Sequence, residues 1–203
     1  FKTPSRRLSN FQSYLNIISR FDAISCVSNE TRKSLYKYGL KEALPNKIAV
    51  HYLPVEAPSN FESLSQNKTP IVLYVSTLSY NKNHLNLLTA TEKLWQSGLS
   101  FKLELVGQAD PSWSPKVKEY IEKLQRKNLP ISWAMHIDQV TLEKKYAECK
   151  FTVYPSLFEG YGLPILESLV RGKPCICGSN GALGEVSKGG GCQILENQQD
   201  PSQ

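Results

Sequence analysis

The apolar residues of this chain come in short blocks, separated by stretches in which apolar and polar residues alternate. A continuous apolar run over 71–75 predicts a buried strand, and 84–98 predicts a helix because its apolar residues recur on one face. The next apolar run, 101–106, ends at Gly107 and predicts another strand. This part of the chain therefore has the strand–helix–strand order that is typical of a parallel sheet.

The same order continues towards residue 203. Ser114 followed by Pro115 predicts the start of a helix, with Ser114 as its N-cap. Later strands are expected at 131–135, 151–154 and 174–177, and later helices at about 141–149 and from Pro164 to Gly172. Helices that connect successive strands imply right-handed crossovers, and strands buried on both faces should be continuous apolar runs, as these are. We therefore predict an α/β fold with a doubly wound parallel sheet over residues 69–203.

Residues 1–60 are too few to form a second doubly wound domain. They contain an apolar run at 22–27, N-cap residues at 28–29 and a second extended run at 48–52. We expect them to be the remnant of an N-terminal domain whose body is missing from this sequence. The polar, turn-rich segment 57–70 is expected to be the linker to the second domain.

Composition and charge narrow the class of protein. Of the 203 residues, 40% are hydrophobic, and 24 Lys and Arg against 18 Asp and Glu give a net charge of +6. This is an ordinary globular composition, and no apolar run approaches the roughly 20 residues that a membrane-spanning helix needs. The positive charge suits nucleic acid, a phospholipid surface or phosphorylated small molecules, and charge alone does not choose among them. The basic stretch 116–127 is interleaved with acidic residues, which favours a solvated face over a nucleic-acid interface.

The five cysteines are odd in number and show no Cys-x-x-Cys spacing. Cys26, Cys175 and Cys177 lie in apolar runs, where a free cysteine packs as a small hydrophobic residue. We therefore expect reduced packing thiols rather than disulfides or a zinc site, and a cytoplasmic protein.

The segment 154–167 carries most of the chemistry. It connects a predicted strand to a predicted helix, and in open α/β sheets ligands bind beyond the carboxyl ends of the strands. Gly160 and Gly162 allow the backbone to approach a ligand closely. The free N–H groups at Gly162 and Leu163 are expected to point towards an anion, which the helix dipole also favours.

Two carboxylates belong to the same segment. Glu159 lies in the loop, and Glu167 lies near the start of the helix. Carboxylates only accept hydrogen bonds, which suits sugar hydroxyls, so a diphosphate with a hydroxyl-rich ring on each side would satisfy both the amides and the acids. A nucleoside diphosphate sugar has this arrangement. The alternative is that Glu159 is a solvated loop residue and Glu167 a first-turn acid stabilised by the helix dipole.

The residues around these acids resemble a known family. Glu159 and Glu167, separated by seven residues and embedded in 155–164, resemble the signature of family 4 retaining glycosyltransferases of the GT-B fold. Segments 172–191 and 75–84 resemble the closing strand–loop segment and the phosphate-binding loop of that family. The resemblance implies that 69–203 is the C-terminal, Rossmann-like, donor-binding domain. It also implies that 1–60 is the end of the N-terminal acceptor domain.

The resemblance also implies roles for single residues. Glu159 would bind the donor sugar's 3- or 4-hydroxyl beside the reacting carbon, and Glu167 would bind the ribose hydroxyls. Lys82 would neutralise the diphosphate leaving group. The loop residues Gly160 and Tyr161 would complete the donor site.

Further roles follow from the same resemblance. Backbone amides near Gly162 and Leu163 would hold the sugar and the distal phosphate. Thr77 and Asn81 are expected to face the diphosphate, at positions where many members of the family carry arginine. His136, at a predicted strand end, would touch the nucleobase, although a lone histidine there is more often a structural group.

The implied function is transfer of a hexose, of the mannose or glucose type, from a nucleoside diphosphate sugar to a hydroxyl acceptor with retention of configuration. The alternatives are a GT-B sugar-nucleotide 2-epimerase and a non-catalytic nucleotide-sugar-binding module. No metal or other cofactor is implied. A sugar or lipid-linked sugar is the expected acceptor, in polysaccharide or glycolipid biosynthesis. The positive charge would suit contact with the inner face of the membrane, and a solvated surface equally. We expect the isolated chain, without the missing N-terminal domain, to be inactive.

Overall fold

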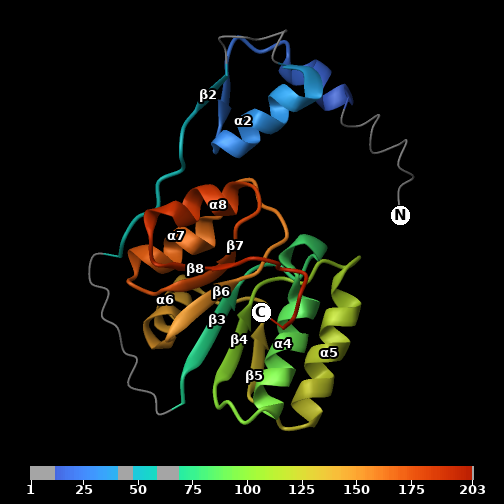
Figure 1. Ribbon diagram of the computed structural model, residues 1–203, viewed down its shortest axis with the longest axis vertical. Coiled ribbons are helices and arrows are strands. Elements are labelled where there is room, and N and C mark those ends of the chain that lie inside the picture. The colour runs from blue at the N-terminus through green and yellow to red at the C-terminus, as the bar shows by residue number, and fades with distance from the viewer. Residues whose placement is uncertain (1–11, 41–47, 59–68, 203) are drawn as a thin grey trace. The chain divides into compact units, whose positions relative to one another are not determined.

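The computed structural model of the chain describes residues 12–40, 48–58 and 69–202 (Figure 1). The chain divides into two compact units, Phe1–Leu53 and Pro54–Gln203, which we call unit 1 and unit 2. Most of the linker expected at 57–70 lies outside the described residues. Each unit has its own core and is described by itself below.

The described part of unit 1 contains a helical segment over residues 12–18, two short parallel strands and helix α2. Strand β1 (Ile24–Cys26) pairs with β2 (Ile48–Val50), and helix α2 (Asn29–Leu35) follows β1 and continues into a π-helical turn, η1 (Tyr36–Leu40). Ser28 is the N-cap of α2, because its side-chain oxygen accepts a hydrogen bond of 3.0 Å from the Thr31 N–H. Both extended runs expected here are present, and each is shorter than the apolar pattern suggested.

Unit 2 is built on a six-stranded parallel sheet with the order β5-β4-β3-β6-β7-β8. The strands are β3 (Ile71–Val75), β4 (Lys102–Val106), β5 (Ile131–Ala134), β6 (Phe151–Tyr154), β7 (Cys175–Gly178) and β8 (Cys192–Leu195). The helices between them are α4 (His84–Gln96), α5 (Ser114–Arg126), α6 (Gln139–Glu148), α7 (Leu163–Val170) and α8 (Ala182–Val186). The prediction of an α/β fold with a doubly wound parallel sheet is confirmed.

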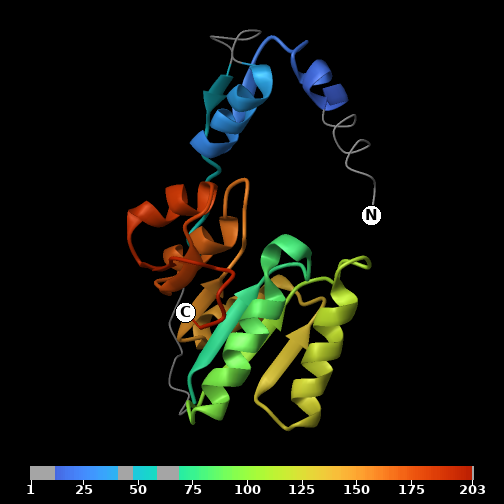
Figure 2. The ribbon, with the colours of Figure 1, turned by 45° about the vertical axis from the view of Figure 1, so that its right-hand side comes forward.

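The two faces of the sheet pack against different helices, because successive strand residues point to opposite sides. Tyr74 of β3 belongs to a core cluster that includes Leu88 of α4, whereas its neighbour Leu73 belongs to a cluster that includes Tyr146 of α6. Figure 2 shows α4 and α5 side by side on one face of the sheet, where they contact each other. Burial on both faces explains why the strands are continuous apolar runs.

Helix starts differ from the predictions by one or two residues. Ser114 is not the N-cap of α5: the preceding Trp113 holds that position, and Ser114 is the buried first residue of the helix. Helix α6 begins earlier than predicted, at Gln139, because the Asp138 side chain accepts a hydrogen bond of 2.7 Å from the Thr141 N–H. Local hydrogen bonds that the apolar pattern does not record therefore decide where a helix begins.

The direction in which successive strands are added to the sheet reverses between β3 and β6, which are parallel neighbours. Because α4 and α7 follow these two strands, the loops after β3 and β6 start at the same edge of the sheet and leave towards opposite faces. This is the topological switch point, at which doubly wound sheets open a crevice for ligands. Gly107, after β4, lets the backbone pack closely against the loop after β3 at the same edge. A Cβ there would lie 2.1 Å from the Ser76 carbonyl oxygen, so the backbone packing requires glycine.

All five cysteines are free, as predicted, and four of them are buried. Among the described residues, we find no helix whose length and hydrophobicity would suit it to crossing a membrane.

Candidate functional site

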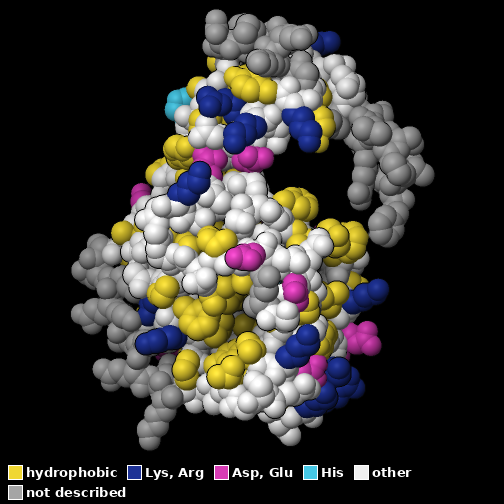
Figure 3. All heavy atoms as spheres, viewed as in Figure 1, with side chains coloured by type: hydrophobic (Ala, Val, Ile, Leu, Met, Phe, Trp, Pro, Cys, Tyr) yellow, Lys and Arg dark blue, Asp and Glu magenta, His cyan; other side chains and the backbone are white. Residues whose placement is uncertain are grey.

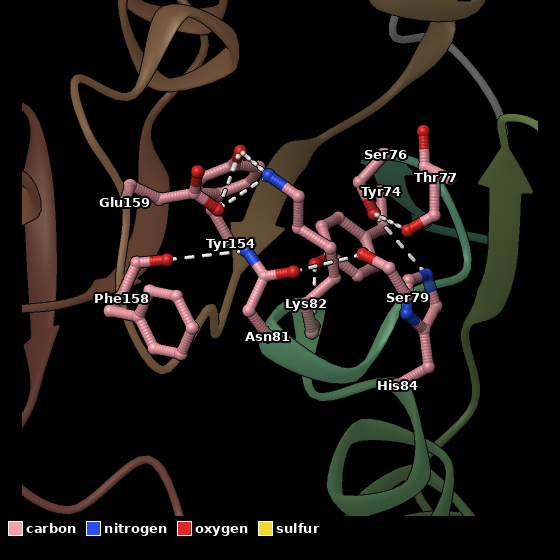
Figure 4. A network of polar contacts seen from close by, with 10 residues as sticks. All are labelled: Tyr74, Ser76, Thr77, Ser79, Asn81, Lys82, His84, Tyr154, Phe158 and Glu159. Carbon is pink, nitrogen blue, oxygen red and sulfur yellow. Dashed lines mark hydrogen bonds and ion pairs between the residues drawn. The ribbon is translucent and has the colours of Figure 1, made fainter. Parts of the chain in front are cut away.

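The loops after β3 and β6 bring Lys82 and Glu159 together at the switch point (Figure 4). Lys82 ends a 3₁₀ turn, η2 (Tyr80–Lys82), and Glu159 lies in the loop between β6 and α7. Lys82 Nζ lies 2.5 Å from Glu159 Oε1, and the two side chains are only 18% and 12% exposed. An ion pair so sheltered from water is held more strongly than one on an open surface.

Tyr154, the last residue of β6, bridges this ion pair. Its hydroxyl accepts a hydrogen bond of 3.0 Å from Lys82 Nζ and donates one of 3.2 Å to Glu159 Oε1. Burial, and then the negative charge of Glu159, raise the pKa of the Tyr154 hydroxyl, so the phenol is a neutral donor. The sequence does not distinguish Tyr154 as a site residue, because a tyrosine at the end of an apolar strand has the pattern of a core residue.

Further hydrogen bonds hold the loop after β3 on its own strand and join it to the loop after β6. The Tyr74 hydroxyl donates to the Lys82 carbonyl oxygen at 2.6 Å. The Leu157 N–H donates to the Asn81 carbonyl oxygen at 2.8 Å, and Asn81 Nδ2 donates to the Phe158 carbonyl oxygen at 3.3 Å. Asn81 was predicted to face a diphosphate, and here its side-chain amide joins the loop after β3 to the loop after β6.

His84 lies beneath the same loop, at the start of α4, and is 2% exposed. Its Nε2 is 3.2 Å from the Ser76 hydroxyl, and its ring stacks at 4.7 Å on Tyr74. Burial, and then the charge of Lys82, lower the pKa of His84 to about 3. Within the part of the chain that the structure describes, His84 Nδ1 has no hydrogen-bond partner. This histidine is therefore neutral and costly to protonate.

Glu167 makes a different set of contacts. It is the fifth residue of α7, which begins at Leu163, so it lies near the start of the helix as expected and just beyond the first turn. The buried Tyr146 of α6 donates a hydrogen bond of 3.0 Å to Glu167 Oε2, and Arg171 Nη1 donates to the Glu167 carbonyl oxygen at 2.8 Å. The helix dipole acts mainly on the first turn, so the Tyr146 hydroxyl is the group that orients this carboxylate.

The loop before α7 ends in a backbone conformation that favours glycine. Gly162 is the N-cap with φ +116°, and a Cβ there would lie 3.3 Å from the Leu183 side chain. Tyr161 and Gly162 are buried, whereas Gly160 and Leu163 are exposed. The first N–H groups of a helix have no partner within it and carry partial positive charge, so this end of α7 is suited to an anion.

The two remaining predicted site residues lie on the surface. Thr77 is exposed in the loop after β3. His136 is exposed just beyond β5, which is separated from β3 by β4, and so belongs to a different loop of the same sheet edge. Among the described residues, no group of three or more His, Cys, Asp or Glu side chains is placed to hold a metal ion.

An apolar cavity of about 370 Å³ lies away from this network, beside α4. Its walls come from α4 and from β3, β6, β7 and β8, with Leu87, Phe151 and Leu195 among the lining residues. Figure 3 shows hydrophobic side chains gathered on this face beneath β8. Neither Lys82 nor Glu159 lines the cavity, so it is distinct from the polar crevice.

Comparison with known proteins identifies the class to which this fold and crevice belong. The family model for glycosyl transferases group 1 matches residues 56–203, and the chain belongs to this family. The serotype-specific mannosyltransferase WbdA of Escherichia coli is 30% identical over 124 residues, which cover 59% of this chain and 15% of that protein. The O-antigen chain mannosyltransferase B of Escherichia coli is 33% identical over 116 residues, which cover 56% of this chain and 30% of that protein.

A solved structure shows the same fold. Anabaena Alr3699/HepE, crystallised in complex with UDP and glucose, superposes with a TM-score of 0.78 at 19% identity, and the match covers 96% of this chain and 54% of that one. The chain thus spans less than a third of the two mannosyltransferases and about half of this structure.

Proposed function

We propose that unit 2 binds a nucleoside diphosphate sugar in the crevice between the loops after β3 and β6, and that it forms the donor half of a retaining hexosyltransferase. The single observation that carries this proposal is the meeting of Lys82 and Glu159 at the switch point. The two side chains are 2.5 Å apart, and Glu159 lies in the loop that leads to the N-terminus of α7. A cation for phosphate and an acceptor for hydroxyls are thus adjacent. The mannosyltransferase names of two relatives, and the UDP and glucose named for HepE, favour a hexose of the mannose or glucose type.

Each polar group has a task in this proposal. Negative charge develops on the diphosphate as its bond to the sugar breaks, and Lys82 together with the first N–H groups of α7 would stabilise that charge. Glu159 would accept a hydrogen bond from a sugar hydroxyl, and Glu167, oriented by Tyr146, would accept those of the ribose. Thr77, Asn81 and His136 have weaker support, because their side chains lie on the surface or join the loops.

Retention by double displacement needs a carboxylate beneath the anomeric carbon. Glu159 is held through one oxygen by two donors, Lys82 and Tyr154, which suits a hydrogen-bond acceptor better than a nucleophile. We therefore favour attack on the same face. The bond between the anomeric carbon and the diphosphate oxygen breaks while the acceptor oxygen bonds to that carbon, and the acceptor's proton passes to the departing phosphate oxygen. This course uses no metal. The proposed acceptor is a hydroxyl of a sugar or a lipid-linked sugar, in keeping with the O-antigen relative.

Calorimetric titration of the 203-residue chain with ADP, GDP, UDP and their glucose or mannose conjugates, in the presence of EDTA, tests the donor site. At least one nucleoside diphosphate should bind saturably. Lys82→Met should weaken that binding by about ten- to a hundredfold, because a hydrogen bond to a charged group contributes about 1.5–3 kcal/mol. Lys93→Met removes the same charge from an exposed position on α4 and serves as the control.

Two results would contradict the proposal. One is the absence of saturable binding by every nucleoside diphosphate in the panel. The other is an equal effect of Lys82→Met and Lys93→Met, since the loss would then reflect net charge rather than a contact in the crevice. Glu167→Gln tests the ribose contact separately, because it should weaken nucleoside diphosphate binding and leave inorganic pyrophosphate, which has no ribose, unaffected.

A further inference from the structure

Two hydrogen-bond donors converge on a single carboxylate oxygen, Glu159 Oε1. Lys82 Nζ and the Tyr154 hydroxyl both donate to Glu159 Oε1, at 2.5 and 3.2 Å, and Lys82 also donates to Tyr154 at 3.0 Å. Figure 4 shows the three side chains pointing towards one another across the two loops. Lys82 therefore already has an anionic partner, and Glu159 already has a cationic donor.

This ion pair competes with the nucleoside diphosphate sugar for the same two side chains. The inference therefore rests on the proposed function. A carboxylate and a phosphate are both anionic acceptors, so Glu159 occupies on Lys82 the place that a donor's diphosphate would take. In the same way, the ammonium of Lys82 occupies the place of a sugar hydroxyl on Glu159. Both side chains are largely buried, and a buried charge that loses its partner is destabilised, so the exchange has to replace each contact that it breaks.

Tyr154 is the group that can stay in place during this exchange. A neutral hydroxyl accepts one hydrogen bond and donates another, so it can hold Lys82 and Glu159 after their direct contact is broken. Its ring is fixed: Tyr154 is 3% exposed and packs edge-to-face on Tyr74, with centroids 5.8 Å apart. Tyr74 in turn donates to the Lys82 carbonyl oxygen, so the two tyrosines hold both the backbone and the side chain of this lysine.

We propose that the Lys82–Glu159 ion pair is a resting contact that a donor's diphosphate displaces, and that Tyr154 is the positioning residue that keeps both side chains aimed into the crevice when the contact breaks. The pair then lowers the affinity for a bare diphosphate. The sugar of the complete donor recovers part of this loss, because it supplies Glu159 with a new hydrogen-bond donor.

Calorimetry with the nucleoside diphosphate that wild type binds, and with its sugar conjugate, tests this inference on the 203-residue chain. Glu159→Gln keeps the shape and removes the charge, so it should bind the bare diphosphate about tenfold more tightly, because charged hydrogen bonds are the stronger ones. The same variant should lose the additional affinity that the sugar brings. A merely structural role for Glu159 would weaken both ligands together.

Tyr154→Phe should weaken both ligands by about fivefold, the effect of one hydrogen bond, because the hydroxyl matters most after the ion pair has separated. In a Lys82→Met background, the same change should have no further effect on diphosphate affinity, since the side chain that it positions is gone. Tyr120→Phe is a matched control. The Tyr120 hydroxyl donates to Glu92 at 2.7 Å, and Glu92 pairs with Lys127 at 2.6 Å, which repeats the tyrosine–glutamate–lysine arrangement between α4 and α5.

The outcomes separate this inference from the proposed function. If wild type binds a nucleoside diphosphate but Glu159→Gln binds it no more tightly, the resting contact is refuted and the donor site stands. If the losses in Tyr154→Phe and Lys82→Met are additive, or if Tyr120→Phe has the same effect, Tyr154 has no positioning role. If wild type binds no nucleoside diphosphate at all, both the proposed function and this inference are wrong.

Discussion

Acidification should destabilise unit 2 through one buried side chain, His84. The folded protein holds the pKa of this histidine at about 3, against an ordinary value of 6.5, because the ring is buried and Lys82 is close. Between these two values the unfolded chain binds a proton that the folded chain does not. Protonation of the unfolded chain therefore does not reduce the free energy of unfolding above pH 6.5. Below that pH the free energy of unfolding declines, and it continues to do so as the pH falls towards 3.

The magnitude follows from the size of the shift. Each pH unit in this window costs about 1.4 kcal/mol, so lowering the pH from 6.5 to about 5 should remove about 2 kcal/mol of unfolding free energy. The pKa values of Glu92, Glu104 and Glu143 are lowered by their cationic partners, and their contributions are lost only as the pH falls below the ordinary value of 4.5. The interval from about pH 6.5 to about pH 5 therefore isolates the histidine, because it also lies below the pKa of about 7 to which Cys192 is lowered.

Urea unfolding at about pH 6.5 and about pH 5, followed by tryptophan fluorescence, measures this loss. The three tryptophans of the chain, Trp95, Trp113 and Trp133, all lie in unit 2, so the signal reports the unit that contains His84. His84→Gln should be less stable at neutral pH but should lose the decline towards pH 5. His136→Gln alters an exposed ring and should keep it. An equal decline in His84→Gln and wild type, or no decline in wild type, would refute the reasoning.

Two further predictions concern packing and thiol chemistry. Gly107→Ala should lower the unfolding free energy by about 2 kcal/mol or more, because φ is +143° and the new Cβ would meet the Ser76 carbonyl, whereas Gly160→Ala, with no atom within 4 Å of its Cβ, should be tolerated. Equal melting temperatures for the two variants would contradict this. Iodoacetamide should label Cys192 first in the native protein, because this cysteine is partly exposed and the Cys175 thiol, by hydrogen bonding, lowers the pKa of Cys192 to about 7. Peptide mass spectrometry should find that label, and equal labelling of the buried cysteines would contradict the assignment.

Part of the candidate site could be predicted because its residues lie close together in the sequence. The loop 154–167 combines a strand end, glycines and a helix start within one short stretch, and each of these has a pattern of its own. The family signature lies in the same stretch, so the sequence predicts both Glu159 and Glu167 as site residues. The helix that carries Glu167 begins one residue earlier than predicted, at Leu163, because Gly162 adopts a positive φ and is its N-cap.

The contacts of the site were not readable in the same way. Lys82 and Glu159 are 77 positions apart, and nothing in either segment indicates that their side chains form an ion pair. Tyr154 and Tyr146 have the pattern of core residues, and only their hydroxyl contacts to Glu159 and Glu167 reveal a second role.

The sequence by itself determined the fold class and most strand positions, because side-chain periodicity and burial on both faces of a sheet act residue by residue along the chain. Strands β3 and β6 were predicted at their observed bounds for this reason. Only the tertiary structure decided which polar groups face one another. Their partners come from loops that are brought together because β6 pairs with β3 rather than with β5. A contact of that kind depends on the pairing order of the strands rather than on any local pattern.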